Sequence, residues 1–140
     1  MTMPVPPHDA GVRGVPPLVL IVDDVALMRD LLGLQLERAG CRFDSADDGV
    51  AALAALHARR YDLVLIDRAM PRMDGCVAAR TWRAHERAHA LVTTPFIGVG
   101  GQPGDRVDCL AAGMQEFVTK PLTIAALDAL LLRFLGYARR

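Results

Sequence analysis

Four charged residues of this chain directly follow apolar, strand-like segments, and three of them are carboxylates that could bind a metal ion. They are Asp23, Asp24, Asp67 and Lys120. If those segments are parallel neighbouring strands, the three carboxylates and the ammonium group meet at one edge of a sheet. Carboxylates crowded in this way repel one another, and one becomes protonated unless a cation neutralises them. Hard oxygen ligands that keep some water suit Mg²⁺, so the pattern predicts a magnesium site.

The choice of lysine at position 120 supports this interpretation. Lys120 is the only lysine of the chain, and the other fifteen of its sixteen basic residues are arginines. Lysine supplies a compact cation on a flexible stem, which the planar fork of arginine does not reproduce. Pro121 follows it, and a cis bond before this proline would fix a turn that aims Lys120 inward. A single lysine could stand there by chance, but its place beside three aspartates favours a function.

The segments that must position these residues alternate between strand and helix patterns. The expected strands are Leu18–Val22, Cys41–Ala46, Leu63–Ile66, Phe96–Val99 and Glu116–Thr119. The expected helices run from Val25 to Ala39, from after Asp48, from Gly75 to His89, from Asp105 to Ala112 and from after Thr123. We expect Leu27, Leu31 and Leu34 to form the apolar face of the first helix. Five such alternations predict an α/β fold: a single doubly wound, five-stranded parallel sheet with helices on both faces.

Composition restricts the class of protein. The 140 residues suffice for one domain with its own core, and 52% of them are apolar. The formal net charge of zero argues against nucleic acid as a partner. No apolar run is long enough to span a membrane, so we expect no membrane partner. The three cysteines are widely spaced and odd in number, which favours buried free thiols and a cytoplasmic location.

The two ends of the chain differ from its centre. Residues 1–16 are rich in proline and lack an apolar signal-peptide core, so they are expected to form a flexible N-terminal tail. Residues 17–136 are expected to form the folded domain, and residues 137–140 a short C-terminal tail.

The string DRAMPRMDG, from Asp67 to Gly75, makes the chain similar to a known family. Together with the acidic pair Asp23-Asp24 and the dipeptide Lys120-Pro121, it resembles the receiver domains of two-component response regulators, including those of chemotaxis. The resemblance covers residues 17–136, and the joint order and spacing of its motifs are highly specific. It implies the flavodoxin-like (βα)5 receiver fold.

The resemblance also implies a mechanism. Asp67 would be the phosphoacceptor that takes a phosphoryl group from a phosphohistidine, carried by a histidine kinase or a histidine phosphotransfer protein. Asp23, Asp24, Asp67 and the backbone carbonyl of Ala69 would hold Mg²⁺, and Lys120 would contact the phosphoryl group. The chain would be no enzyme beyond accepting and losing its own phosphoryl group, and it would signal or relay through protein contacts, with a downstream protein target possible.

The chain departs from the family at one position. After the fourth strand the family usually has a serine or threonine, whereas counting from Pro95 places Gly100 there and counting back from Pro103 places Gly98. The missing hydroxyl would remove a hydrogen bond worth about 1.5–3 kcal/mol to a charged group. In the family this hydroxyl is coupled to an aromatic switch residue, which matches Phe117 here. The usual conformational switch is therefore in question, while phosphoryl acceptance does not need the hydroxyl.

Several alternatives arise from this departure. The backbone N–H groups of Gly100 and Gly101 could contact phosphate in place of the hydroxyl. The domain could instead be a degenerate receiver that acts as a phosphorylation-independent scaffold, or it could be the receiver segment of a hybrid histidine kinase. A dinucleotide-binding loop is disfavoured because Pro103 stands where the third glycine should be. A phosphatase is disfavoured because Ala69 stands where a second catalytic aspartate is expected.

Overall fold

The alternation of strands and helices is confirmed by the computed structural model, which describes residues 15–136. Among these residues the strands are β1 (Leu18–Val22), β2 (Arg42–Ala46), β3 (Leu63–Asp67), β4 (Phe96–Gly100) and β5 (Glu116–Thr119). The helices are α2 (Ala26–Arg38), α3 (Gly49–Ala58), α4 (Gly75–Ala88), α5 (Asp105–Ala111) and α6 (Ile124–Leu135). Of the predicted tails 1–16 and 137–140, residues 1–14 and 137–140 lie outside the described residues, and Val15 and Pro16 are in neither a helix nor a strand.

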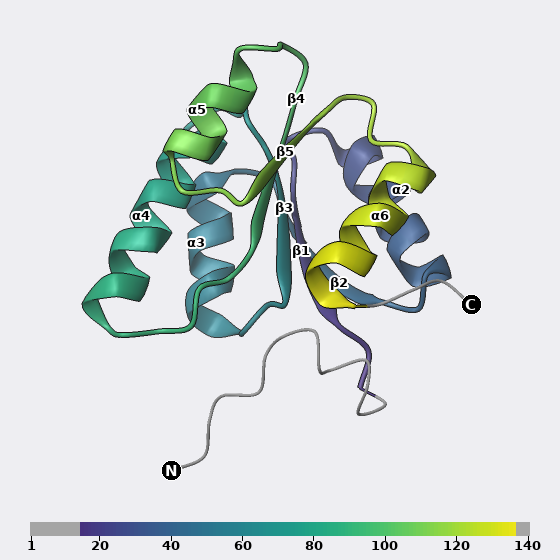
Figure 1. The fold of residues 1–140 in the computed structure, drawn as a ribbon, viewed down its shortest axis with the longest axis horizontal. Coiled ribbons are helices and arrows are strands. Elements are labelled where there is room, and N and C mark those ends of the chain that lie inside the picture. Colours follow the sequence, from purple (N-terminus) through teal and green to yellow (C-terminus); the bar gives the residue numbers. More distant parts are fainter. Residues whose placement is uncertain (1–14, 137–140) are drawn as a thin grey trace.

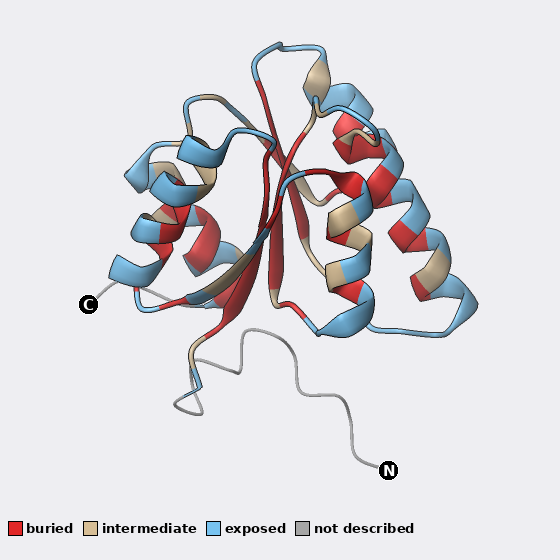
Figure 2. Cartoon of the chain, turned by 180° about the vertical axis from the view of Figure 1, so that it is seen from behind, coloured by how far each residue is buried: buried red, intermediate tan, exposed pale blue. Residues whose placement is uncertain are grey.

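The strands form one parallel sheet in the order β2-β1-β3-β4-β5. Helices α3, α4 and α5 cover one face and α2 and α6 cover the other (Figure 1). Every residue of β1, β3 and β4 is buried, as expected for strands covered on both faces (Figure 2). The strand order reverses between β1 and β3, and the carboxyl ends beside this reversal are where such sheets bind ligands.

Side chains cap the N-termini of three helices. The side chains of Asp48, Asp74 and Thr123 accept hydrogen bonds from the backbone N–H groups of Ala51, Val77 and Ala126, at 2.8, 2.9 and 3.1 Å. Each bond satisfies a donor that the first turn of a helix leaves without a partner. Just after the C-terminal end of α5, Gly113 has a φ of +98°, a backbone conformation that suits a residue without a Cβ.

The predicted apolar face of the first helix is wrong. Leu27, Leu31 and Leu34 are 64%, 46% and 42% exposed, whereas Leu32 and Leu36 are buried. The helix carries two apolar stripes, and the structure buries the one that lies beside Gly33. A Cβ at Gly33 would collide with the ring of Phe43 on β2, so this glycine lets the helix approach the sheet closely. Packing against the sheet therefore decides between two stripes that periodicity alone does not distinguish.

A buried ion pair within α4 is hydrogen-bonded to the segment before β5. Arg83 donates to Glu86 at 2.7 Å, to the carbonyl oxygen of Gly113 at 2.9 Å and to the side-chain oxygen of Gln115 at 2.8 Å. Glu86 in turn accepts from the backbone N–H of Thr94 at 2.8 Å. Both charged side chains are almost fully buried, at 9% and 4% exposure. Every charge is thus matched by hydrogen bonds, as a buried pair requires.

All three cysteines are buried and none forms a disulfide, as the sequence predicts. Among residues 15–136, none of the helices is both long and apolar enough to cross a membrane.

Candidate functional site

The carboxyl ends of β1, β3 and β5 bring the four predicted residues together. Asp23, Asp24 and Asp67 each offer a carboxylate oxygen, and these oxygens lie within 4.8 Å of one another. The Nζ atom of Lys120 lies 3.0 Å from Oδ2 of Asp67. The Lys120–Pro121 peptide bond is cis, as predicted. One edge of the sheet therefore combines three carboxylates with one ammonium group, from segments up to 97 positions apart in the sequence.

Backbone hydrogen bonds orient two of the carboxylates. Oδ1 of Asp23 accepts from the N–H of Val25 at 2.9 Å, and Oδ1 of Asp67 accepts from the N–H of Ala69 at 3.2 Å. Asp23 and Asp67 are both 5% exposed, whereas Asp24 is exposed. The bond from Ala69 places this residue beside the cluster; the metal-binding role of its carbonyl stays a prediction.

The charges of the cluster are incompletely balanced. Burial raises the pKa of Asp23 despite its bond from Val25, and the neighbouring charge of Asp67 raises it further. Burial acts to lower the pKa of Lys120, but its hydrogen bond to Asp67 and the surrounding carboxylates outweigh this effect and raise it. Lysine thus stays protonated and neutralises only one of the three negative charges.

A hard divalent cation fits this donor set. The three aspartates supply converging oxygen ligands with excess negative charge, which suits Mg²⁺ with some retained water. The residues that would hold it are Asp23, Asp24 and Asp67, and the bound ion would neutralise charge on phosphoryl oxygens.

Mg²⁺ should stabilise the protein, and Asp23→Asn should weaken this effect. A carboxyl whose pKa is raised in the folded state binds its proton more tightly there, so the free energy of unfolding falls as pH rises through the interval between the unfolded and the raised pKa. Asparagine keeps the acceptor for Val25 without the charge, so the metal-free variant should unfold at a higher temperature than wild type at neutral pH. Wild type should gain about 2.7 kcal/mol at Mg²⁺ concentrations of 100 times Kd.

Thermal unfolding with and without Mg²⁺, from acidic to neutral pH, measures both effects. Equal Mg²⁺ stabilisation of wild type and Asp23→Asn would exclude this carboxylate from the metal site.

Gly100 occupies the end of β4 beside the cluster. Its neighbour Val99 pairs with Asp67 in the sheet, and its carbonyl oxygen accepts from the N–H of Lys120 at 2.8 Å. Gly98 lies deeper, where a Cβ would contact the sulfur of Cys109 at 2.8 Å. The geometry therefore favours Gly100 as the position that takes the place of the family's hydroxyl residue.

The space that a side chain at Gly100 would need is already filled. A Cβ there would lie 2.6 Å from Oδ2 of Asp105 and 3.0 Å from two ring atoms of Phe117. Phe117 is 5% exposed, so its ring is packed inward beside the glycine. The predicted switch residue thus occupies a buried position that no hydroxyl obstructs. Asp105 was not predicted from the sequence as a neighbour of this position.

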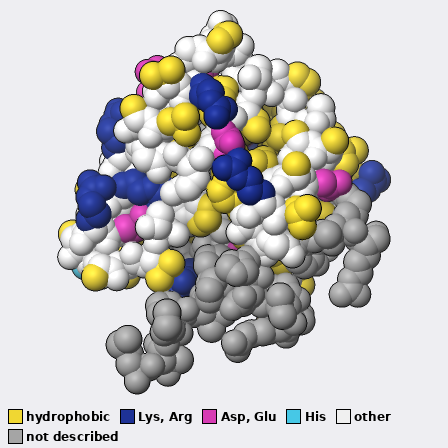
Figure 3. Space-filling view, viewed as in Figure 1, with side chains coloured by type: hydrophobic (Ala, Val, Ile, Leu, Met, Phe, Trp, Pro, Cys, Tyr) yellow, Lys and Arg dark blue, Asp and Glu magenta, His cyan; other side chains and the backbone are white. Residues whose placement is uncertain are grey.

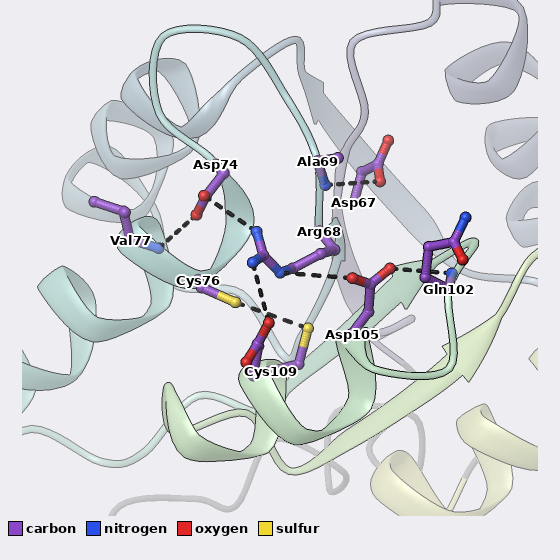
Figure 4. A network of polar contacts seen from close by, with 10 residues as sticks. Asp67, Arg68, Ala69, Asp74, Cys76, Val77, Gln102, Asp105 and Cys109 are labelled. Atoms are coloured by element: carbon purple, nitrogen blue, oxygen red, sulfur yellow. Dashed lines mark hydrogen bonds and ion pairs between the residues drawn. The ribbon is translucent and has the colours of Figure 1, made fainter.

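Asp105 belongs to a network around Arg68, the residue after Asp67 (Figure 4). Arg68 donates to Asp74 at 3.1 Å and to Asp108 at 3.3 Å, and its Nε lies 4.0 Å from Oδ1 of Asp105. Oδ2 of Asp105 also accepts from the N–H of Gln102 at 3.2 Å. One guanidinium therefore links the end of β3 to the starts of α4 and α5. The only sequence signal for Asp105 was its place at the start of a short helix. Aspartates are common at such positions, so this signal could not identify its contacts.

Gly100→Thr should be poorly tolerated unless Asp105 is shortened as well. The added Cβ collides with Asp105 and presses on Phe117, so we expect a loss of about 1–3 kcal/mol, typical of overpacking. The double variant Gly100→Thr with Asp105→Ala should recover part of this loss, and its phosphoryl lifetime should differ from that of wild type. Urea denaturation and the decay of the phosphorylated form measure the two effects. A single variant as stable as wild type would show that Asp105 does not hold this position.

A glycine is also required at the start of α4. The N–H of Gly75 donates to the carbonyl oxygen of Arg68 at 3.1 Å, and a Cβ on Gly75 would collide with the carbonyl oxygen of Asp67. The glycine that ends the DRAMPRMDG string thus lets helix α4 begin directly against the proposed acceptor residue.

Two arginines meet on the face formed by α5, β5 and α6. Arg106 and Arg133 lie 2.9 and 2.7 Å from the two carboxylate oxygens of Glu116. Figure 3 shows this face, with an acidic group between two basic ones and apolar side chains around them. These hydrogen bonds and charges lower the pKa of Glu116, the bond from the N–H of Phe117 contributing most.

The chain matches a known protein family. The family described as response regulator receiver domain matches residues 19–132. Hybrid signal transduction histidine kinase F of Dictyostelium discoideum is 32% identical over 130 residues, which cover 91% of this chain and 12% of that protein. The chain spans 12–54% of the length of the first curated relatives that it matches.

Solved structures share the fold. The receiver domain of a sensor histidine kinase from Pseudomonas aeruginosa, with a magnesium ion coordinated in its active-site cleft, is 31% identical with a TM-score of 0.78, over 87% of this chain and 99% of that one. A Saccharomyces cerevisiae receiver domain, crystallised with a histidine phosphotransfer protein, is 21% identical with a TM-score of 0.83, over 86% of this chain and 90% of that one. The second likeness concerns the fold alone.

Proposed function

Because the chain belongs to the family of response regulator receiver domains, we propose that Asp67 is its phosphoacceptor and that Asp23, Asp24 and Asp67 bind Mg²⁺ for the transfer. The chain is a receiver domain of two-component signalling. The observation that carries the residue assignment is the convergence of three carboxylates, with their oxygens within 4.8 Å, and the Lys120 ammonium 3.0 Å from Asp67.

The arrangement suits transfer from a phosphohistidine. The Asp67 carboxylate attacks phosphorus and forms an O–P bond, while the N–P bond of the donor breaks and its electron pair returns to the imidazole ring. The Lys120 ammonium, already bonded to Asp67, lies where it can pair with an oxygen of the incoming phosphoryl group. Negative charge on that group is stabilised mainly by positioned cations, as in other phosphoryl transfers.

The donor that fits this chemistry is a histidine kinase or a histidine phosphotransfer protein. The chain itself would turn over no separate substrate and would only accept and lose its own phosphoryl group. A cytoplasmic location is in keeping with three cysteines that form no disulfide, and the zero net charge gives no support to nucleic acid as a partner. Because the chain spans 12–54% of its first curated relatives, the output could lie in a downstream protein or elsewhere in a longer chain.

The coupling from phosphate to partner would differ from the family's hydroxyl switch. Gly100 offers no hydroxyl, and Phe117 is already packed inward beside it. The Arg68 network, which reaches both α4 and α5, offers another route, since Arg68 directly follows the acceptor. Phosphate charge on Asp67 would compete with the nearby aspartates for this guanidinium.

The test is phosphorylation of the purified chain by a small phosphodonor such as acetyl phosphate. We expect one phosphoryl adduct by intact mass, formed with Mg²⁺, absent with EDTA and removed by hydroxylamine, as for an acyl phosphate. An absence of any adduct, even with a phosphorylated histidine phosphotransfer protein as donor, would refute the proposal and leave the scaffold interpretation.

A further inference from the structure

A cavity of about 340 Å³ lies between α3 and α4, at the ends of these helices far from Asp67. In Figure 1 the C-terminal ends of α3 and α4 lie at the lower side of the molecule, whereas the carboxyl ends of the strands lie at the upper side. Its wall includes Leu56, His57, Arg60, Trp82, His85 and Leu91. This volume is within the range of small-molecule binding sites.

One wall of the cavity is aromatic. The rings of Trp82 and His85 are stacked, with centroids 4.7 Å apart and planes 28° apart. His57 meets both rings edge-on, at 5.0 and 4.6 Å. Burial, together with the neighbouring His89 and His57, lowers the pKa of His85, which favours its neutral form. His89 lies against His85 as well, with ring centroids 4.2 Å apart, so the wall offers a ligand the edges of these rings rather than their faces.

The charged side chains of the cavity wall are all cationic. Its wall contains two arginines and no acidic side chain. Arg59 pairs with Asp44 at 2.7 Å, whereas Arg60 forms no ion pair with any residue that the structure describes. The hydroxyl of Tyr61 already donates a hydrogen bond to Asp44, at 2.6 Å, and so cannot donate one to a ligand. Arg60 is thus the cation at this cavity that is available to an incoming anion.

The indole N–H of Trp82 is a second group at this cavity, after the Arg60 guanidinium, that lacks a partner of its own among the described residues. The side chain is 6% exposed, and its indole N–H has no hydrogen-bond partner among residues 15–136. A buried donor without an acceptor is uncommon in folded proteins, because leaving it unmade costs about 1–3 kcal/mol. The nitrogen is shielded in this arrangement, so a ligand with an acceptor group would satisfy it once the side chains around it move aside.

We propose that this cavity binds a small planar aromatic anion, with its ring against the ring edges of Trp82 and His85 and its acid group at Arg60. Metal binding by the histidines is disfavoured, because the aspartate cluster is the only group among the described residues that brings three such ligand atoms within 4.8 Å. The proposal is independent of phosphoryl acceptance, since the two sites share no residue.

The chain's only tryptophan lies in this cavity, so a ¹⁵N-labelled sample gives one indole N–H signal that reports on it. The probe is 2-naphthoate, compared with the neutral 2-naphthylmethanol and with acetate. We expect naphthoate to give a saturable shift of the Trp82 signal. The alcohol should bind about tenfold more weakly, which is the loss expected for one hydrogen bond to a charged group. Acetate should not shift the signal.

Arg60→Gln should weaken naphthoate binding by about tenfold and leave the alcohol unaffected. Arg80→Gln is the matched control, because Arg80 is an exposed arginine of α4 outside this cavity, and it should bind like wild type. The same spectra show that each variant is folded. The proposal is overturned if naphthoate gives no saturable shift, if the alcohol or acetate binds as well as the acid, or if Arg60→Gln binds like wild type. None of these results depends on whether a phosphoryl adduct forms.

Discussion

Replacing Asp67 with asparagine abolishes phosphoryl incorporation, which is the largest functional effect we expect from any single substitution. The asparagine amide is a poor nucleophile. The substitution also removes the carboxylate that forms an ion pair with Lys120 at 3.0 Å. Asp23 and Asp24 are poorer acceptors, because among the described residues the Lys120 ammonium forms an ion pair with Asp67 alone. Intact mass after incubation with Mg²⁺ and acetyl phosphate measures the adduct.

Asp74→Asn is the matched control for this experiment. Asp74 caps α4 through the N–H of Val77, and asparagine caps helices about as well as aspartate. This variant should therefore accept a phosphoryl group much as wild type does. A residual adduct on Asp67→Asn, located elsewhere by peptide mapping, would contradict the assignment of the acceptor.

Arg83→Met should produce the largest loss of stability, about 3–5 kcal/mol, because it leaves Glu86 buried without its partner. The substitution also removes the donors to the carbonyl oxygen of Gly113 and to Gln115, which hold the start of β5 against α4. A loss of this size is a large part of the free energy of unfolding of a domain of this length. Urea denaturation measures it.

The control for this second prediction is Arg80→Met, on the same helix but exposed, which should change stability by no more than about 0.5 kcal/mol. The double variant Arg83→Met with Glu86→Met should be more stable than Arg83→Met alone, because it removes the stranded charge. A loss below about 1 kcal/mol for Arg83→Met would show that the buried pair is dispensable.

Local signals sufficed for the elements and for the four charged residues. The strand runs are continuous and apolar because both faces of the sheet are covered, and parallel strands bring the residues at their carboxyl ends to one edge. Caps such as Asp48 and Thr123 act within a few residues of themselves, so they too could be identified from the sequence. Lys120 and Asp67 are far apart in the sequence. They were expected to meet because the alternation of strands and helices predicts parallel strands, whose carboxyl ends lie at one edge of the sheet.

The features that the sequence did not reveal depend on contacts between distant segments. The buried stripe of α2 is decided by the ring of Phe43 against Gly33, and the place of Asp105 by its approach to Gly100. The Arg83 network joins residues about 30 positions apart, and nothing near Arg83 marks it as a buried charge. Periodicity and motif spacing carry no information on contacts of this kind.

The lone lysine also gives the protein an unusual chemical property. Reagents that acylate primary amines can modify only Lys120 and the chain's amino terminus, because every other basic side chain is a guanidinium or an imidazole. The ammonium is one-third exposed and its pKa is raised by its carboxylate neighbours, so its reaction with an activated ester should be slow while Asp67 holds it. The rate of labelling at this one atom would then report on the occupancy of the strand-end site without any added fluorophore or isotope.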